Sequence, residues 1–419
     1  GRFWIVVAVR RSNPSGSFFF LAVSQGPEAS GGWWLYALDV NPAGTTNFVD
    51  LPSLGSDDRA IYLTGNLFDL ATFDFQGALL RVLRKAPLLD GSPAPFFDFS
   101  GLSVSGRLAF HLLAAQSLSP SAAGYVAHTR FPDTCELALW RVITPESSGD
   151  PLLTLRVISV APPCAAPPNA VQAGTTVRIE TGGPRLNAAI WRNGFLWLAA
   201  TAGFNWGSGL VATARLWQID TRSFPATSVL QDFWQGADGL HAFYPSVAVD
   251  PSDNAVVLYN QSAADRFVGL AAAGQLRTDP RNLLQPPLEL AAGAGPYVQL
   301  DAQGRNRWGD YNSIAVDPAD GSFWAFGEVA GEDNRWNTVL AHLAFSFPSP
   351  TPTRTATATA TPTNTLTATA TFTRTRTPLP SATPSPTSTP SATASPTRTP
   401  SRTASATPSP SPSRSPTRS

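Results

Sequence analysis

The chain has 419 residues, 43% of them hydrophobic, and its formal net charge is zero because 29 basic residues balance 29 acidic ones. Seven arginines follow residue 347, where Asp and Glu are absent, so subtracting 7 from 29 leaves residues 1–347 with 22 basic and 29 acidic side chains, a balance of −7. An acidic body excludes a general affinity for nucleic acid, which depends on cationic contacts to phosphate.

The sequence opens directly in strand-like residues, GRFWIVVAVR, and contains no methionine. We therefore interpret it as a fragment or processed form with a truncated N-terminus, in which a signal peptide would not be visible. No apolar run approaches the roughly 18–20 residues of a transmembrane helix. The Thr/Ser/Pro-rich segment that ends the sequence is of a kind found on exported proteins, so the expected location is extracellular or at the cell surface.

One hairpin pattern recurs along the chain. Residues 246–251, SVAVDP, and residues 313–318, SIAVDP, are alternating apolar segments that end in Asp-Pro and are followed by a second β-rich run. Pro presets φ for a turn, and Asn, Asp and Gly tolerate positive φ at its end, so each copy predicts a β-hairpin. Six such turns are predicted, at Gly16, Asp58, Gly106, Gly194, Asn254 and Gly321.

A third apolar run follows most of these hairpins, and the turns are separated by 42, 48, 88, 60 and 67 residues. This range fits the blades of a β-propeller, which are four-stranded sheets around a central axis. We predict an all-β fold, a propeller of six recognisable blades over residues 1–347, or seven if the N-terminus is truncated. A β-sandwich or a solenoid is the alternative.

Residues 348–419 consist almost entirely of Thr, Pro, Ser, Ala and Arg. Such a composition buries too little apolar surface to offset chain entropy, which predicts a disordered segment. Tracts of this kind are typical of O-glycosylated stalks on exported proteins. A plain linker to a further domain or anchor is an equally compatible interpretation.

Cys135 and Cys164 are the only two cysteines, too few for a metal cluster. In an exported protein they would form a disulfide that stabilises the fold by roughly 3 kcal/mol through chain entropy. Cys164 lies in the Pro-rich segment APPCAAPP, and two unrelated thiols remain the alternative.

Three stretches resemble a broad group of exported bacterial β-propeller proteins: RWGDYNSIAVDPADGSFWAF, VQAGTTVRIETGGPRLNAAIWRNGFLWLAAT and DRAIYLTGNLFDLATFDFQGALLRVL. The resemblance spans most of residues 1–347, and RWGDY is its most specific part. It implies an extracellular propeller and no particular reaction. The six-bladed sialidase-like propellers are a more distant comparison, because the turns lack the Asp-box at its defining residue, and no sialidase chemistry is carried over.

A propeller brings the loops that enter its innermost strands together at one end of the channel. Aligning the repeats predicts a ring of side chains there, formed by Asp50, Asp98, Arg185, Tyr244, Asp310 and Tyr311, with His241 and Arg307 in the flanking loops. Clustered carboxylates, tyrosines and arginines suit hydroxyl-rich or ionic ligands. The same side chains would instead tie blades together if they only cap backbone groups and pair with one another.

The sequence thus predicts an exported, monomeric β-propeller that binds a glycan, a surface polymer or a protein. It contains no phosphate-binding loop, nucleophile elbow or metalloprotease His pair, and we assign no catalytic residue, metal or cofactor. One alternative is a glycan-processing enzyme that uses two carboxylates of the ring. Another is a purely structural repeat module of a larger surface protein.

Overall fold

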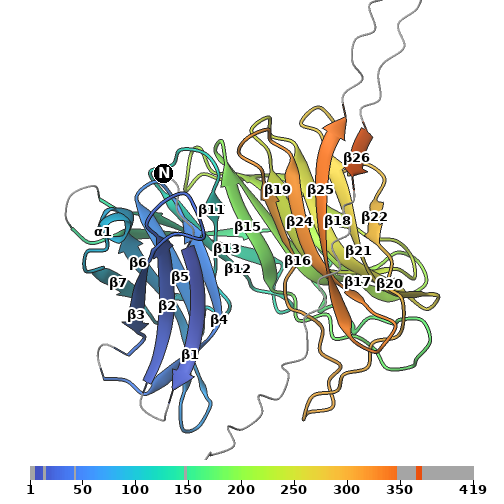
Figure 1. The fold of residues 1–419 in the computed structure, drawn as a ribbon, viewed down its shortest axis with the longest axis horizontal. Helices are drawn as coiled ribbons and strands as arrows, with labels where there is room; N and C mark the ends of the chain where they lie inside the picture. The colour runs from blue at the N-terminus through green and yellow to red at the C-terminus, as the bar shows by residue number, and fades with distance from the viewer. Residues whose placement is uncertain (1–4, 13–15, 42–43, 146–148, 347–364, 370–419) are drawn as a thin grey trace, which may run out of the picture. The chain divides into compact units, whose positions relative to one another are not determined.

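The computed structural model is an all-β protein (Figure 1). It describes residues 5–12, 16–41, 44–145, 149–346 and 365–369, all within one compact unit of residues 1–375. The short α1 (Lys85–Asp90) is the one helix of the described residues, and none there is long and apolar enough to cross a membrane.

The strands follow one another in antiparallel meanders. The first meander contains β1 (Ile5–Ser12), β2 (Gly16–Ser24) and β3 (Trp33–Asp39). The second contains β4 (Asn47–Ser56), β5 (Ala60–Asp69), β6 (Phe75–Arg84) and β7 (Phe96–Phe99). The third contains β10 (Leu113–Ala114), β12 (Gly124–Thr129), β13 (Glu136–Ile143) and β14 (Leu152–Ser159).

Three further meanders complete the described chain. The fourth contains β15 (Leu186–Arg192), β16 (Phe195–Asn205), β17 (Leu210–Asp220) and β18 (Ser228–Gln235). The fifth contains β19 (His241–Val249), β20 (Ala255–Ala263), β21 (Arg266–Gln275) and β22 (Leu288–Ala291). The last contains β23 (Ser313–Val316), β24 (Phe323–Ala330), β25 (Trp336–Ser346) and β26 (Thr365–Thr369).

The first hairpin of each meander tests the predicted turns. Those at Gly16, Asp58, Gly194, Asn254 and Gly321 are confirmed by the pairing of the strands on either side. The third is wrong in its assignment to a blade. Gly106, with φ 77°, turns a separate two-stranded hairpin of β8 (Ser103–Val104) and β9 (Arg107–Leu108), and the third meander begins only afterwards, at β10.

The first strands of the second, third and fourth meanders lie close together. Strand β11 (Gln116–Ser117) continues the course of β10 and pairs in parallel with both β4 and β15, so that Gln116 faces Ser56 on one side and Ile190 on the other. These pairings join the second and fourth meanders into one nine-stranded sheet. First strands that run side by side in one direction are the arrangement expected around a propeller axis.

Each large hydrophobic core lies between two successive meanders. Tyr62 of β5 and Trp140 of β13 share one core, and Trp197 of β16 and Tyr259 of β20 share another. Because a meander packs on neighbours at both faces, its second strand is buried on both sides. This explains why β5 begins with eight buried residues instead of the alternation of a half-buried strand.

No strand of the last meander pairs with a strand of the first within the residues that the structure describes. Ring closure and the number of blades therefore stay predictions, whereas the all-β class is confirmed.

The last meander includes part of the segment that the sequence predicts to be disordered. Strand β26, residues 365–369, pairs antiparallel with β25, from Ser346 opposite Thr365 to His342 opposite Thr369 (Figure 1). Thr-rich TLTAT has high β propensity and lies in a Pro-free stretch, so its backbone N–H groups are available to a ladder. The other residues of 348–419 lie outside the described part of the chain.

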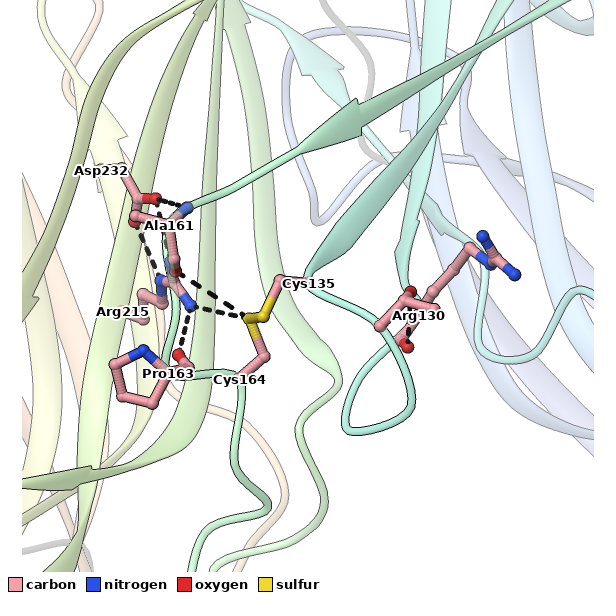
Figure 2. The surroundings of a disulfide bond; sticks show 8 residues. Arg130, Cys135, Ala161, Pro163, Cys164, Arg215 and Asp232 are labelled. Atoms are coloured by element: carbon pink, nitrogen blue, oxygen red, sulfur yellow. Dashed lines mark hydrogen bonds and ion pairs between the residues drawn. A yellow bond between two sulfur atoms is a disulfide. The ribbon is translucent and has the colours of Figure 1, made fainter.

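The two cysteines, Cys135 and Cys164, form a disulfide with a Cα–Cα distance of 5.4 Å (Figure 2). Beside it, the fully buried Arg215 of β17 donates to Asp232 and to the carbonyl of Pro163 at 2.8 Å. Cys135 immediately precedes β13, so the bond connects the third meander to a loop held on the fourth.

Candidate functional site

Four of the predicted ring residues meet in the structure. Arg185, Tyr244, Asp310 and Tyr311 line one small pocket of about 20 Å³. Its other lining residues are Leu51, His111, Gly182, Gly183 and Asn187. The pocket has room for about one water molecule. Ligand-sized space therefore has to come from a neighbouring cavity.

The small pocket is lined by one residue from each of five successive meanders, in or just before the first strand. These residues are Leu51, His111, Asn187, Tyr244 and Tyr311. Leu51, His111 and Tyr244 have φ near 50°, in the left-handed region that non-Gly residues seldom adopt. Strands β4, β15 and β19 each have a register shift at this level, which turns side chains toward the shared pocket.

The second strand of the preceding meander supports these irregular positions. The side chain of Asn66 accepts the N–H of His111 at 2.8 Å, and Thr201 Oγ1 accepts the N–H of Tyr244 at 2.9 Å. Both supporting side chains are fully buried. The unusual backbone therefore keeps its hydrogen bonds, which a buried bulge needs in order to be stable.

Tyr244 supports the loop that carries Arg185. Its hydroxyl donates to the carbonyl of Glu180 at 3.1 Å, and its ring lies against Gly182, where an added Cβ would come within 3.2 Å of it. Gly182 has φ 72°, and the N–H of Arg185 donates to Gly183 at 2.7 Å, so the loop turns tightly. With Tyr244 only 3% exposed, its main effect is to position Arg185.

Arg185 is half-buried, and its guanidinium makes no hydrogen bond or ion pair with the described residues. Arg307, by contrast, donates to Asp310 at 2.7 Å and lies 3.4 Å from a carboxylate oxygen of Glu180. The two carboxylates are thus held by one arginine, while Arg185 has unused donors. Its positive charge, after burial, is the second cause that lowers the pKa of His111 to about 4.

Asp50 and Tyr311 lie at the exposed side of the pocket. Asp50 is exposed on β4, one residue before Leu51, and Tyr311 is 50% exposed. The pKa of Tyr311 is raised by burial and by the charge of Asp310, and Asp50 acts in the same direction. The predicted residues Asp50, Arg185, Arg307, Asp310 and Tyr311 therefore share one electrostatic neighbourhood.

Two predicted residues lie elsewhere. Asp98 is on β7, where it forms a bidentate pair with the fully buried Arg81 of β6, at 2.7 and 2.8 Å. The position expected for Asp98 in the third meander belongs to His111. His241 is 4% exposed within β19 and does not line the pocket, because its Nδ1 accepts the N–H of Ala212.

A larger cavity of about 370 Å³ adjoins the small pocket, and His111, Gly183 and Arg185 line both. The remaining lining residues are Arg107, Leu108, Phe110, His128, Thr129, Arg130, Phe131, Asp133 and Pro184. This cavity was not predicted, because the hairpin at Gly106 was assigned to the start of the third blade. The segment AFHLLA, aligned with the other first strands, would have pointed to His111.

The described residues contain no cluster of three or more His, Cys, Asp or Glu side chains suited to holding a metal ion. The polar side chains of the two pockets are arginines, histidines, tyrosines, an asparagine, a threonine and scattered carboxylates. Such groups suit recognition of an anionic or hydroxyl-rich molecule.

No family model and no curated protein matches the sequence. Among solved structures, the chain is similar to a Dyadobacter fermentans protein of unknown function (10% identity, TM-score 0.37, covering 70% of this chain and 79% of that one). It is also similar to Trypanosoma rangeli sialidase, with 9% identity and a TM-score of 0.38 over 80% of this chain and 52% of the sialidase. A third similar structure is Synechocystis apocarotenoid oxygenase, with 10% identity and a TM-score of 0.38 over 80% of this chain and 67% of the oxygenase. The chain thus spans about half the length of the sialidase.

Proposed function

We propose that this chain is an extracellular β-propeller that binds a glycan where its innermost strands meet, around Arg185. The observation that carries the proposal is the convergence of five successive meanders on one pocket, beside an arginine with no partner among the described residues. Arg185 is half-buried and none of its nitrogen atoms is enclosed without a partner, so its donors are open to a ligand.

The propeller itself is supported by the antiparallel order of the meanders and by cores that lie between successive ones. Parallel pairing of β11 with β4 and β15 supports first strands gathered around an axis. The disulfide between Cys135 and Cys164 supports an oxidising compartment, as for secreted proteins. The Thr/Pro-rich segment 348–419 supports export as well.

Binding is favoured over cleavage of a glycosidic bond. Such cleavage needs two carboxyl groups free to act as acid and as base or nucleophile. Asp310 and Glu180 are both engaged by Arg307, which leaves Asp50 as the exposed carboxylate beside the pocket.

The proposal is tested by a glycan-array screen of the full chain beside two variants. Arg185→Ala should abolish binding. Arg192→Ala is the matched control, because Arg192 is also half-buried and lies at the opposite end of β15. Binding that survives Arg185→Ala, or an absence of binding with the wild-type chain, would exclude this site. Glycan hydrolysis that Asp310→Asn abolishes would replace the binding function with an enzymatic one.

A further inference from the structure

The larger cavity is lined by three arginines, Arg107, Arg130 and Arg185, and by two histidines and the carboxylate of Asp133. Arg185 reaches it with an unpaired guanidinium, whereas Arg130 and Arg107 are paired with Glu136 and Asp133. The cavity therefore holds one guanidinium that makes no ion pair or hydrogen bond with a described side chain. One guanidinium presents two parallel N–H bonds, which match the two oxygens of a single carboxylate.

His128 adds a second donor. The residue is 4% exposed, and its Nδ1 is enclosed without a hydrogen-bond partner, so Nε2 is the nitrogen that reaches the cavity. Burial lowers the pKa of His128 to about 4, which keeps the ring neutral near pH 7. An enclosed, unpaired N–H is costlier than an enclosed lone pair, so the proton belongs on Nε2, facing the cavity.

The same cavity offers apolar surface to the rest of a ligand. Phe110 and Leu108 line the cavity and are 40% and 45% exposed, and the buried Phe131 also lines it. Such surfaces pack against the C–H face of a sugar ring, while the donors fix its orientation. The volume of about 370 Å³ is at the lower end of the range of small-molecule sites.

We infer that the cavity takes the carboxylate-bearing ring of an acidic glycan, a uronate, with its carboxylate on the guanidinium of Arg185 and on Nε2–H of His128. The inference rests on the proposed glycan-binding function and names its ligand class. A neutral sugar would offer the free donors of Arg185 no charged acceptor, and a cation would be repelled by the guanidinium.

The test compares a galacturonate trimer with its trimethyl ester, in which each carboxylate becomes an uncharged ester with one added methyl group, by titration calorimetry on the full chain. The acid should bind about 10- to 100-fold more tightly, as expected for a charge-assisted bidentate bond. Arg185→Gln should remove this preference and His128→Phe should reduce it, while the control Arg192→Gln should retain it.

The comparison of acid and ester on the wild-type chain remains decisive even if a variant fails to fold. Equal affinities for the two probes would overturn the uronate inference and leave glycan binding standing. Binding of neither probe, together with an empty glycan array, would overturn both. A preference for the acid that persists in a folded Arg185→Gln variant would show that another cation recognises the carboxylate, which also refutes the assignment.

Discussion

Protonation of buried His128 should make the fold less stable in weak acid. Burial lowers its pKa from 6.5 to about 4, with the charge of Arg130 as the next cause. Between those values the unfolded chain binds more protons than the folded one, so stability rises with pH across this window. Moving from pH 7 to pH 5 should then cost about 2 kcal/mol through this one side chain.

The measurement is urea unfolding followed by tryptophan fluorescence at pH 5, 6, 7 and 8, for the wild type and for His128→Leu. Between pH 7 and pH 5, the free energy of unfolding of the variant should fall by about 2 kcal/mol less than that of the wild type. Asp57 has a pKa raised by burial and acts in the opposite direction, but it is present in both proteins and cancels in the comparison.

At pH 7 and above, His128 is largely neutral in both the folded and the unfolded chain. The difference in stability between wild type and variant should therefore be constant there, which serves as an internal control. An identical pH dependence for wild type and variant would refute the reasoning. It would mean that, in the folded protein, water reaches the imidazolium of His128 at little cost, either directly or after the ring rotates.

Three further predictions concern stability and are measured by the same urea unfolding at pH 7. Cys135→Ser should destabilise the chain by roughly 3–4 kcal/mol, because the disulfide spans 29 residues, and an unchanged midpoint under oxidising conditions would contradict it. Asp98→Asn should cost about 3–5 kcal/mol by leaving Arg81 buried and unpaired; a loss below about 1 kcal/mol would show that water reaches the guanidinium. Gly124→Ala should cost about 1–3 kcal/mol of stability, because the new Cβ would lie 2.1 Å from a buried tyrosine ring of β5. Gly26→Ala is the matched control and should leave stability unchanged, because the space around Gly26 is open.

The repeated hairpins were predictable because their turn chemistry is local. Asp-Pro followed by Asn or Gly fixes a turn whatever the strands pack against, as at Asn254 and Gly321. The third meander was not predictable in the same way. Its first hairpin joins β10 to β12 through a longer connection, and the short turn at Gly106 belongs to an added hairpin.

The candidate site was predictable in outline. Alignment of the first strands found Arg185, Asp310 and Tyr311, because equivalent positions of successive repeats meet at one level. Burial and partners could not be read from that alignment. Tyr244 lies beneath a loop, His241 is within a strand, and Asp98 neutralises Arg81, and each outcome depends on contacts between elements far apart in the sequence.

The way these positive-φ positions are supported has a consequence for how the pocket can evolve. The N–H of Tyr244 is satisfied by Thr201, which belongs to the preceding meander, and the N–H of His111 by Asn66 in the same manner. A substitution at one of these pocket positions is therefore constrained by its hydrogen-bond partner on the preceding meander, so the two positions should change together. Recombination that exchanges whole repeats would separate such partners, so productive crossovers should fall where a pocket residue travels together with its support.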